Sequence, residues 1–114
     1  MYVLLRLIAD CADAPAVQRM TDTANAALKP WQARATLPPE PRPGRPGRYE
    51  FTYQLQPGVR ATLEAVVNAT PGDWHVSGDE DDGSAVWCPG AGPPLVSPQV
   101  VWAELIHSRH GELG

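Results

Sequence analysis

The sequence predicts an α+β fold of the ferredoxin-like, split βαβ type, in which two helices cover one face of an antiparallel sheet that extra C-terminal strands extend. The main observation is the order of hydrophobic patterns, which runs strand, helix, strand, strand, helix and then further strands. In addition, 43% of the 114 residues are hydrophobic and 19% are charged, as in a soluble domain with one core. We therefore expect residues 1–114 to form a single domain.

A strand and a helix open the chain. Residues 2–8 form an apolar run interrupted only by Arg6, which is typical of a central strand buried on both faces. Asp13 stands before Ala14-Pro15 and predicts the N-cap of a helix. The apolar residues that follow are spaced by three and four, which predicts a buried helix face made of Val17, Met20, Ala24, Ala27 and Leu28. Pro30 predicts the end of this helix.

Two further strands are predicted on either side of a proline-rich loop. Residues 48–55 give the clearest strand pattern, because polar residues such as Glu50 alternate with an apolar face of Tyr49, Phe51, Tyr53 and Leu55. A weaker pattern predicts a strand over residues 31–37. The connection, residues 38–47, contains five prolines and cannot pair as a central strand. We expect it to be an exposed, mobile loop rich in Pro and Arg.

The second half of the chain predicts one more helix and a group of strands. Pro57-Gly58 precedes a helical pattern that ends at Pro71-Gly72 and has an apolar face of Val59, Leu63, Val66 and Val67. Residues 73–77 and 84–87 predict the arms of a hairpin, and residues 100–107 predict a last strand. His107 and His110 lie at the expected frayed end, where residues 108–114 are predicted to form a flexible tail.

Charge and cysteine content disfavour several classes of function. The net charge is −4 and no aromatic pair is interleaved with Arg42, Arg45 and Arg48 of the loop, which argues against nucleic-acid binding. These arginines could contact phosphates or a partner's carboxylates, or simply keep the loop solvated. Cys11 and Cys88 lack C-x-x-C spacing, which disfavours a zinc site, and two cysteines are too few for a disulfide framework. This cysteine content favours a reducing compartment. A chemical role for either cysteine stays open. The apolar start lacks the basic stretch of a signal peptide and no segment is long enough to span a membrane, so we expect a cytoplasmic protein.

No combination of residues predicts catalysis, a cofactor site or a metal site, so we expect a protein that is not an enzyme. The most unusual charge feature is the acidic run in the predicted hairpin turn. It is interpreted either as a solvated tip or as an acidic patch offered to a basic partner. The residues that we predict to contact a partner are this run and two nearby tryptophans: Asp79, Glu80, Asp81, Asp82, Trp74 and Trp87.

The last third of the chain carries a further signal. Residues 84–90 contain a predicted strand that ends at Trp87 and is followed by Cys88-Pro89, and residues 97–105 contain a Pro-initiated strand with Trp102-Ala103. This pattern resembles the closing segments of small bacterial immunity proteins, which neutralise polymorphic or contact-dependent growth inhibition toxins. Cys88 departs from it, since a turn former such as Asn is expected there. The resemblance implies an inhibitor that binds one cognate toxin domain and blocks its active site or its approach to substrate.

Two other classes of function remain open from the sequence. The chain could be a small ferredoxin-like enzyme or ligand-binding domain that acts on a small molecule, with His75 and Tyr53 as polar groups in a pocket between sheet and helices. It could also be a structural subunit of a larger assembly. The sequence predicts neither the oligomeric state, nor the inhibited toxin activity, nor the binding surface.

Overall fold

The computed structural model describes residues 1–70, 74–79, 81–89 and 96–109. Its elements follow one another in the order strand, helix, three strands, helix and three strands, with a short 3-10 helix after the first helix. They are β1 (Tyr2–Asp10), α1 (Ala14–Ala27), η1 (Lys29–Trp31), β2 (Arg34–Ala35), β3 (Glu40–Pro41), β4 (Arg48–Leu55), α2 (Arg60–Ala69), β5 (Trp74–Gly78), β6 (Asp82–Trp87) and β7 (Val100–Ser108).

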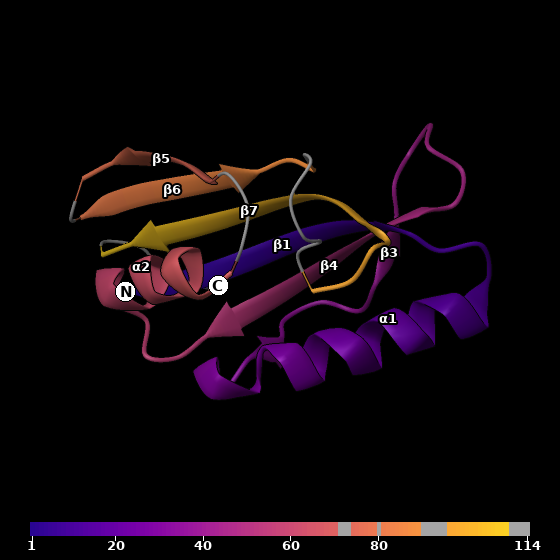
Figure 1. Ribbon diagram of the computed structural model, residues 1–114, viewed down its shortest axis with the longest axis horizontal. Coiled ribbons are helices and arrows are strands. Elements are labelled where there is room, and N and C mark those ends of the chain that lie inside the picture. Colours follow the sequence, from indigo (N-terminus) through magenta and orange to yellow (C-terminus); the bar gives the residue numbers. More distant parts are fainter. Residues whose placement is uncertain (71–73, 80, 90–95, 110–114) are drawn as a thin grey trace.

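The strands form one sheet in the order β2-β4-β1-β7-β6-β5, and β3 also pairs with β4. Figure 1 shows the strands from β4 to β5 side by side in this order. Each of these pairings is antiparallel. The prediction of an α+β fold with an antiparallel sheet and two helices is therefore confirmed. The strand that follows α2, β5, lies at the far edge of the sheet, and the chain returns through β6 so that β7 takes the place beside β1.

The core lies on one face of the sheet only. Alternate residues of β1 from Val3 to Ala9 are almost fully buried, whereas the residues between them are half-buried. The buried set packs in one cluster with Met20 and Ala24 of α1 and with Leu63 of α2. Both helices therefore cover the same face, and no helix among the described residues covers the other.

The prediction that residues 2–8 are buried on both faces is thus wrong, although β1 is central in the sheet. The apolar run led to this wrong prediction because both faces of β1 carry apolar residues. Leu4 and Ile8 lie on the uncovered face, while Leu5 and Leu7 lie on the core face. Consecutive side chains of a strand point to opposite faces, so an all-apolar strand does not by itself reveal how many faces are covered.

The helices begin where their local signals predict. The Asp13 carboxylate accepts a hydrogen bond from the Ala16 N–H at 2.9 Å and caps α1, with Pro15 in the first turn. The helix ends at Ala27, which is exposed rather than part of the predicted buried face. Helix α2 begins at Arg60, shortly after Pro57-Gly58, and buries Leu63 and Val66 as expected.

Two predictions before β4 need correction. The strand predicted over residues 31–37 shrinks to β2, because Trp31 lies in η1 and Gln32 adopts a left-handed φ of 49°. The loop of residues 38–47 is largely exposed, as predicted, but it is not without structure. Its residues 40–41 form β3 at the edge of the sheet, where a strand tolerates proline, and the Arg42 N–H donates to the Arg48 carbonyl at 2.8 Å. Its mobility stays a prediction.

The C-terminal part also differs from the expected frayed end. The hairpin of β5 and β6 forms as predicted, and β7 continues to Ser108. His107 is only 3% exposed, and the Arg109 N–H donates to the Asp81 carbonyl at 2.7 Å. His107 and Ser108 therefore belong to the sheet and Arg109 is hydrogen-bonded beside it, whereas residues 110–114, with His110, lie outside the described residues. Among the described residues no helix is both long and apolar enough to span a membrane.

Candidate functional site

The face of the sheet opposite the helices, here called the open face, is a mixed apolar and charged surface. Pairing across β4, β1 and β7 places Arg6 between Thr52 and Glu104, and Ile8 between Glu50 and Trp102. The half-buried residues of its three central strands include Leu4, Arg6, Ile8, Glu50, Thr52, Gln54, Trp102, Glu104 and Ile106. The open face therefore presents both apolar area and paired charges.

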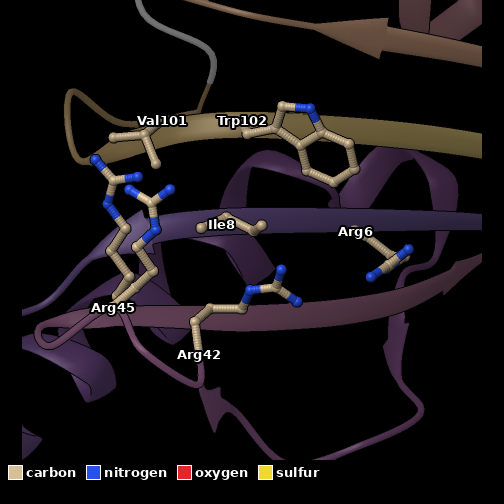
Figure 2. Close-up of a pocket in the computed structure, with 7 residues that line it drawn as sticks. Arg6, Ile8, Arg42, Arg45, Val101 and Trp102 are labelled. Atoms are coloured by element: carbon tan, nitrogen blue, oxygen red, sulfur yellow. The ribbon is translucent and has the colours of Figure 1, made fainter.

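A cavity of about 370 Å³ opens on this face and is here called the arginine pocket. Figure 2 shows Arg42 and Arg45 reaching in from the loop before β4, with Ile8 between them and the Trp102 ring of β7. The residues that line the pocket are Arg6, Ile8, Arg42, Arg45, Arg48, Val101 and Trp102. Four of the nine Lys and Arg residues of this acidic chain therefore meet at one place.

Arg6 is the centre of a charge network beside the pocket. Its Nε donates to Glu50 Oε1 at 2.6 Å, and its Nη1 donates to Glu104 Oε1 at 3.1 Å. The hydrogen bond with Glu50 is the main reason that the pKa of Arg6 is raised, so the guanidinium stays charged. Its Cζ lies 5.9 Å from the centre of the Trp102 ring, a cation–π contact. Glu50 and Glu104 are thus half-buried partners of an arginine.

The arginines that line the pocket are not all paired with carboxylates. Arg42 Nη1 lies 3.4 Å from Glu50 Oε2, and Arg48 Nε lies 3.1 Å from Asp10 Oδ1. Arg45 has no ion pair among the described residues. The other three pocket arginines thus share the carboxylates of Glu50, Glu104 and Asp10, and Arg45 is the one without a carboxylate within ion-pair distance.

Local turn chemistry explains why three loop arginines line one pocket. The segment Arg42-Pro43-Gly44-Arg45-Pro46-Gly47-Arg48 repeats one three-residue unit, and both of its glycines have positive φ, 70° and 79°. The N–H of Arg45 donates to the Arg42 carbonyl and that of Arg48 to the Arg45 carbonyl, at 3.2 and 3.1 Å. Two successive turns therefore bring arginines spaced by three to the same cavity.

A bulge in β7 builds the opposite wall of the pocket. Ile8 pairs with Trp102, but Ala9 pairs with Val100, so Val101 is an extra residue in this strand. A bulge interrupts the alternation of side chains, and it lets the neighbours Val101 and Trp102 both line the pocket. Nothing in the sequence marks this bulge, which is why Trp102 was not predicted as a site residue.

The predicted partner-binding acids lie elsewhere: Asp79 follows β5, Asp81 precedes β6 and Asp82 begins it, and these three residues are here called the acidic turn. Asp79 Oδ1 accepts hydrogen bonds from the Asp81 and Asp82 N–H groups, both at 2.9 Å, and these bonds lower the pKa of Asp79. Asp81 pairs with Arg109 at 3.1 Å, and Asp82 accepts from Ser108 Oγ at 2.9 Å. The three carboxylates thus support the turn, and Glu80 lies outside the described residues.

The two tryptophans predicted as anchors lie on the helix side of the sheet. Trp87 is 2% exposed and belongs to the core, so its side chain offers almost no surface to a partner. Trp74, paired with it across β5 and β6, is half-buried and donates its Nε1–H to Thr70 Oγ1 at 2.9 Å. The structure therefore does not bring either tryptophan together with the arginine pocket.

The residues proposed for a small-molecule site also lie apart. Tyr53 is 2% exposed in β4, where burial raises the pKa of its hydroxyl, while His75 is exposed in β5 at the other edge of the sheet. Cys11 is buried, Cys88 is exposed, and both are free. Within the described part of the chain no three His, Cys, Asp or Glu residues gather as metal ligands.

Comparisons with known proteins add no identification to this geometry. No family model matches the chain, and no curated protein or solved structure is similar enough to count as a match. The arginine pocket and the open face are therefore interpreted from their own contacts.

Proposed function

We propose that this chain is a non-enzymatic binding domain that docks one partner protein on the open face of its sheet. The observation that carries the proposal is the arginine pocket with Trp102 on its wall, on a sheet face that no described helix covers. Tryptophan and arginine are the residues that most often dominate the energy of protein interfaces. A partner that covers Leu4, Ile8 and Ile106 would remove their half-exposed apolar surface from water.

The partner in this proposal is a bacterial toxin domain, which the chain neutralises as an immunity protein by covering the active site or the path of the substrate. The resemblance of residues 84–90 and 97–105 to closing segments of immunity proteins supports this choice, and the second segment carries Trp102 on the open face. A cytoplasmic location belongs to the same proposal, supported by two free cysteines, Cys11 and Cys88, as expected in a reducing compartment.

The finer fold assignment is also a proposal. We infer a ferredoxin-like arrangement made by β1, α1, β2, β4 and α2, in which β7 rather than β5 completes the sheet beside β1. In this interpretation β5 and β6 are the added strands. They extend the sheet without changing the one-sided cover of helices.

Co-expression with the product of a neighbouring gene that encodes a candidate toxin domain tests the function. The wild-type chain should restore growth and give a stable one-to-one complex. Trp102→Ala should weaken the complex by about 30-fold or more, because loss of a central aromatic anchor typically costs at least about 2 kcal/mol. Val76→Ala is the matched control, since Val76 is 48% exposed but lies in β5 on the helix side of the sheet. Loss of protection by the control alone, or no complex at all, would contradict the proposal.

A small-molecule binding function is the second candidate, because the arginine pocket has a volume within the usual range of roughly 300–1,000 Å³ for ligand sites. Its location differs from the pocket between sheet and helices that the sequence suggested. A small organic acid that binds the pocket tightly, together with no protection against any neighbouring toxin, would favour this candidate.

A further inference from the structure

We propose that the arginine pocket is a carboxylate-binding site and that the partner inserts an acidic side chain into it. The carboxylate preference follows from the pocket itself, whereas the source of the carboxylate rests on the proposed function. Charge, hydrogen-bonding capacity and the apolar wall each support the inference.

The ion pairing of the pocket leaves one arginine for a monovalent anion. Arg6, Arg42 and Arg48 pair with Glu50, Glu104 and Asp10, whereas Arg45 has no ion pair among the described residues. One further carboxylate would pair with it. A phosphate monoester carries about −1.5 to −2 charges at neutral pH, so it would leave excess negative charge close to Glu50 and Glu104. The pocket is therefore matched to a carboxylate rather than to a phosphate monoester.

The guanidinium groups retain donors for such an anion. Among the hydrogen bonds of the described residues, Arg42 uses Nη1 and Arg48 uses Nε, while the Arg45 guanidinium uses none. The remaining N–H groups can bind a planar carboxylate in the two-pronged geometry that arginine favours. An anion here would also relieve the repulsion among like charges that share one cavity.

The wall of the pocket suits the stem of an acidic side chain. Ile8, Val101 and Trp102 line one side, so the methylene groups of a Glu or Asp could pack there while the carboxylate faces the arginines.

The same reasoning disfavours the acidic turn as the main contact. Asp79, Asp81 and Asp82 already accept hydrogen bonds or pair with Arg109 within the turn. The inferred partner surface is therefore acidic where it meets this chain, unlike the basic partner that the sequence suggested.

Nuclear magnetic resonance titration of the full chain tests the inference with defined probes. A capped triglutamate peptide should shift the Trp102 indole N–H and the Arg45 Nε–H signals in a saturable way. Arg45→Gln should weaken this binding by about tenfold or more, since a hydrogen-bonded charge partner is lost. Arg34→Gln is the matched control and should leave affinity unchanged, because Arg34 bonds Gln54 at 2.9 Å and does not line the pocket.

Further probes separate the possible outcomes. Tighter binding of inorganic phosphate or of an oligothymidine strand than of the peptide would overturn the carboxylate assignment, as would equal effects of Arg45→Gln and Arg34→Gln. Tighter binding of benzoate than of the peptide would keep the carboxylate site but overturn its occupation by an acidic protein segment.

The toxin complex separates this inference from the proposed function. Arg45→Gln should weaken that complex at least tenfold. If Trp102→Ala breaks the complex while Arg45→Gln leaves it intact, the binding function stands and the acidic contact is overturned. If triglutamate binds as expected but no toxin complex forms, the carboxylate site is supported and the proposed function fails.

Discussion

His107 is buried, although its position near the end of the chain predicted a frayed segment. It lies in β7 at 3% exposure, and its Nδ1 is buried without a hydrogen-bond partner among the described residues. Burial lowers its pKa below the usual value, the charge of Arg60 lowers it further, and Asp82 and Asp81 partly oppose this. The histidine also lines a cavity of about 320 Å³ together with Arg60 and Arg109. The neutral imidazole is therefore the form that the fold favours.

The lowered pKa predicts that protonation of His107 destabilises the fold. Between the folded pKa and the unfolded value near 6.5, the unfolded chain binds more protons, so the free energy of unfolding decreases as the pH falls through this window. This contribution is fully present above about pH 6.5. Urea unfolding at several pH values should give a smaller pH slope for His107→Gln than for wild type. His75→Gln, at an exposed position, should keep the wild-type slope, and identical slopes in all three proteins would refute the prediction.

Two glycines with positive φ provide a matched pair of substitutions. Gly78 has φ of 88°, and an added Cβ would clash with the Asp82 carbonyl and lie 2.7 Å from the Gly83 Cα. Gly44 has φ of 70°, but no atom lies within 4 Å of an added Cβ. Gly44→Ala should therefore cost only the left-handed backbone term of about 1–2 kcal/mol. Gly78→Ala should cost clearly more, as measured by chemical denaturation, and equal losses would show that the hairpin shifts to accept the methyl group.

At the scale of the element, neighbouring residues of β1 lie on opposite faces of the sheet, one covered by helices and one open. Leu5 is 1% exposed in the core and Leu4 is half-buried on the open face. Leu5→Ala should lower the free energy of unfolding by about 2–5 kcal/mol, because it leaves a cavity among packed side chains. Leu4→Ala should cost about 1 kcal/mol or less, in proportion to its partial burial. Similar losses in urea denaturation would mean that the open face is covered in solution.

Local patterns predicted some elements well and others poorly, for identifiable reasons. Strand β4 has the bounds that alternation predicted, because its Phe51, Tyr53 and Leu55 face a core that extends along the whole strand. Strand β2 was predicted too long, since Trp31 is apolar but belongs to η1. The sequence shows the arginines of the proline-rich loop, but not that they line one pocket. That arrangement depends on two turns, and composition does not reveal the direction of a turn.

At the scale of the whole molecule, charge is unevenly distributed over a chain of net charge −4. Four arginines line one pocket on the open face, whereas the acidic turn lies between β5 and β6 at the far edge of the sheet. The two regions would steer partners of opposite charge, so association kinetics can tell which region meets the partner.

We expect the arginine pocket to control association with the proposed toxin partner. The association rate should fall as salt rises, because exposed charges are screened beyond roughly 8–10 Å at physiological ionic strength. Arg45→Gln should slow association at low salt and flatten this dependence. Asp82→Asn is the comparison, since it removes one charge of the acidic turn while the amide oxygen can still accept from Ser108 Oγ. Stopped-flow kinetics in which Asp82→Asn alone removes the salt dependence would instead support a basic partner.

The sequence by itself determined the elements whose signals are local, such as the Asp13 cap of α1 and the alternation of β4, because neighbouring residues set backbone preference and side-chain direction. Only the tertiary structure decided which face of β1 stays uncovered and where the Arg42–Arg48 turns point. It also decided the burial of His107 and the pairing of Arg6 with Glu104. These features depend on residues that are far apart in the chain and that come together because β7, rather than β5, pairs with β1. The period of a hydrophobic pattern shows which residues share a face, but it does not show which strand pairs with β1.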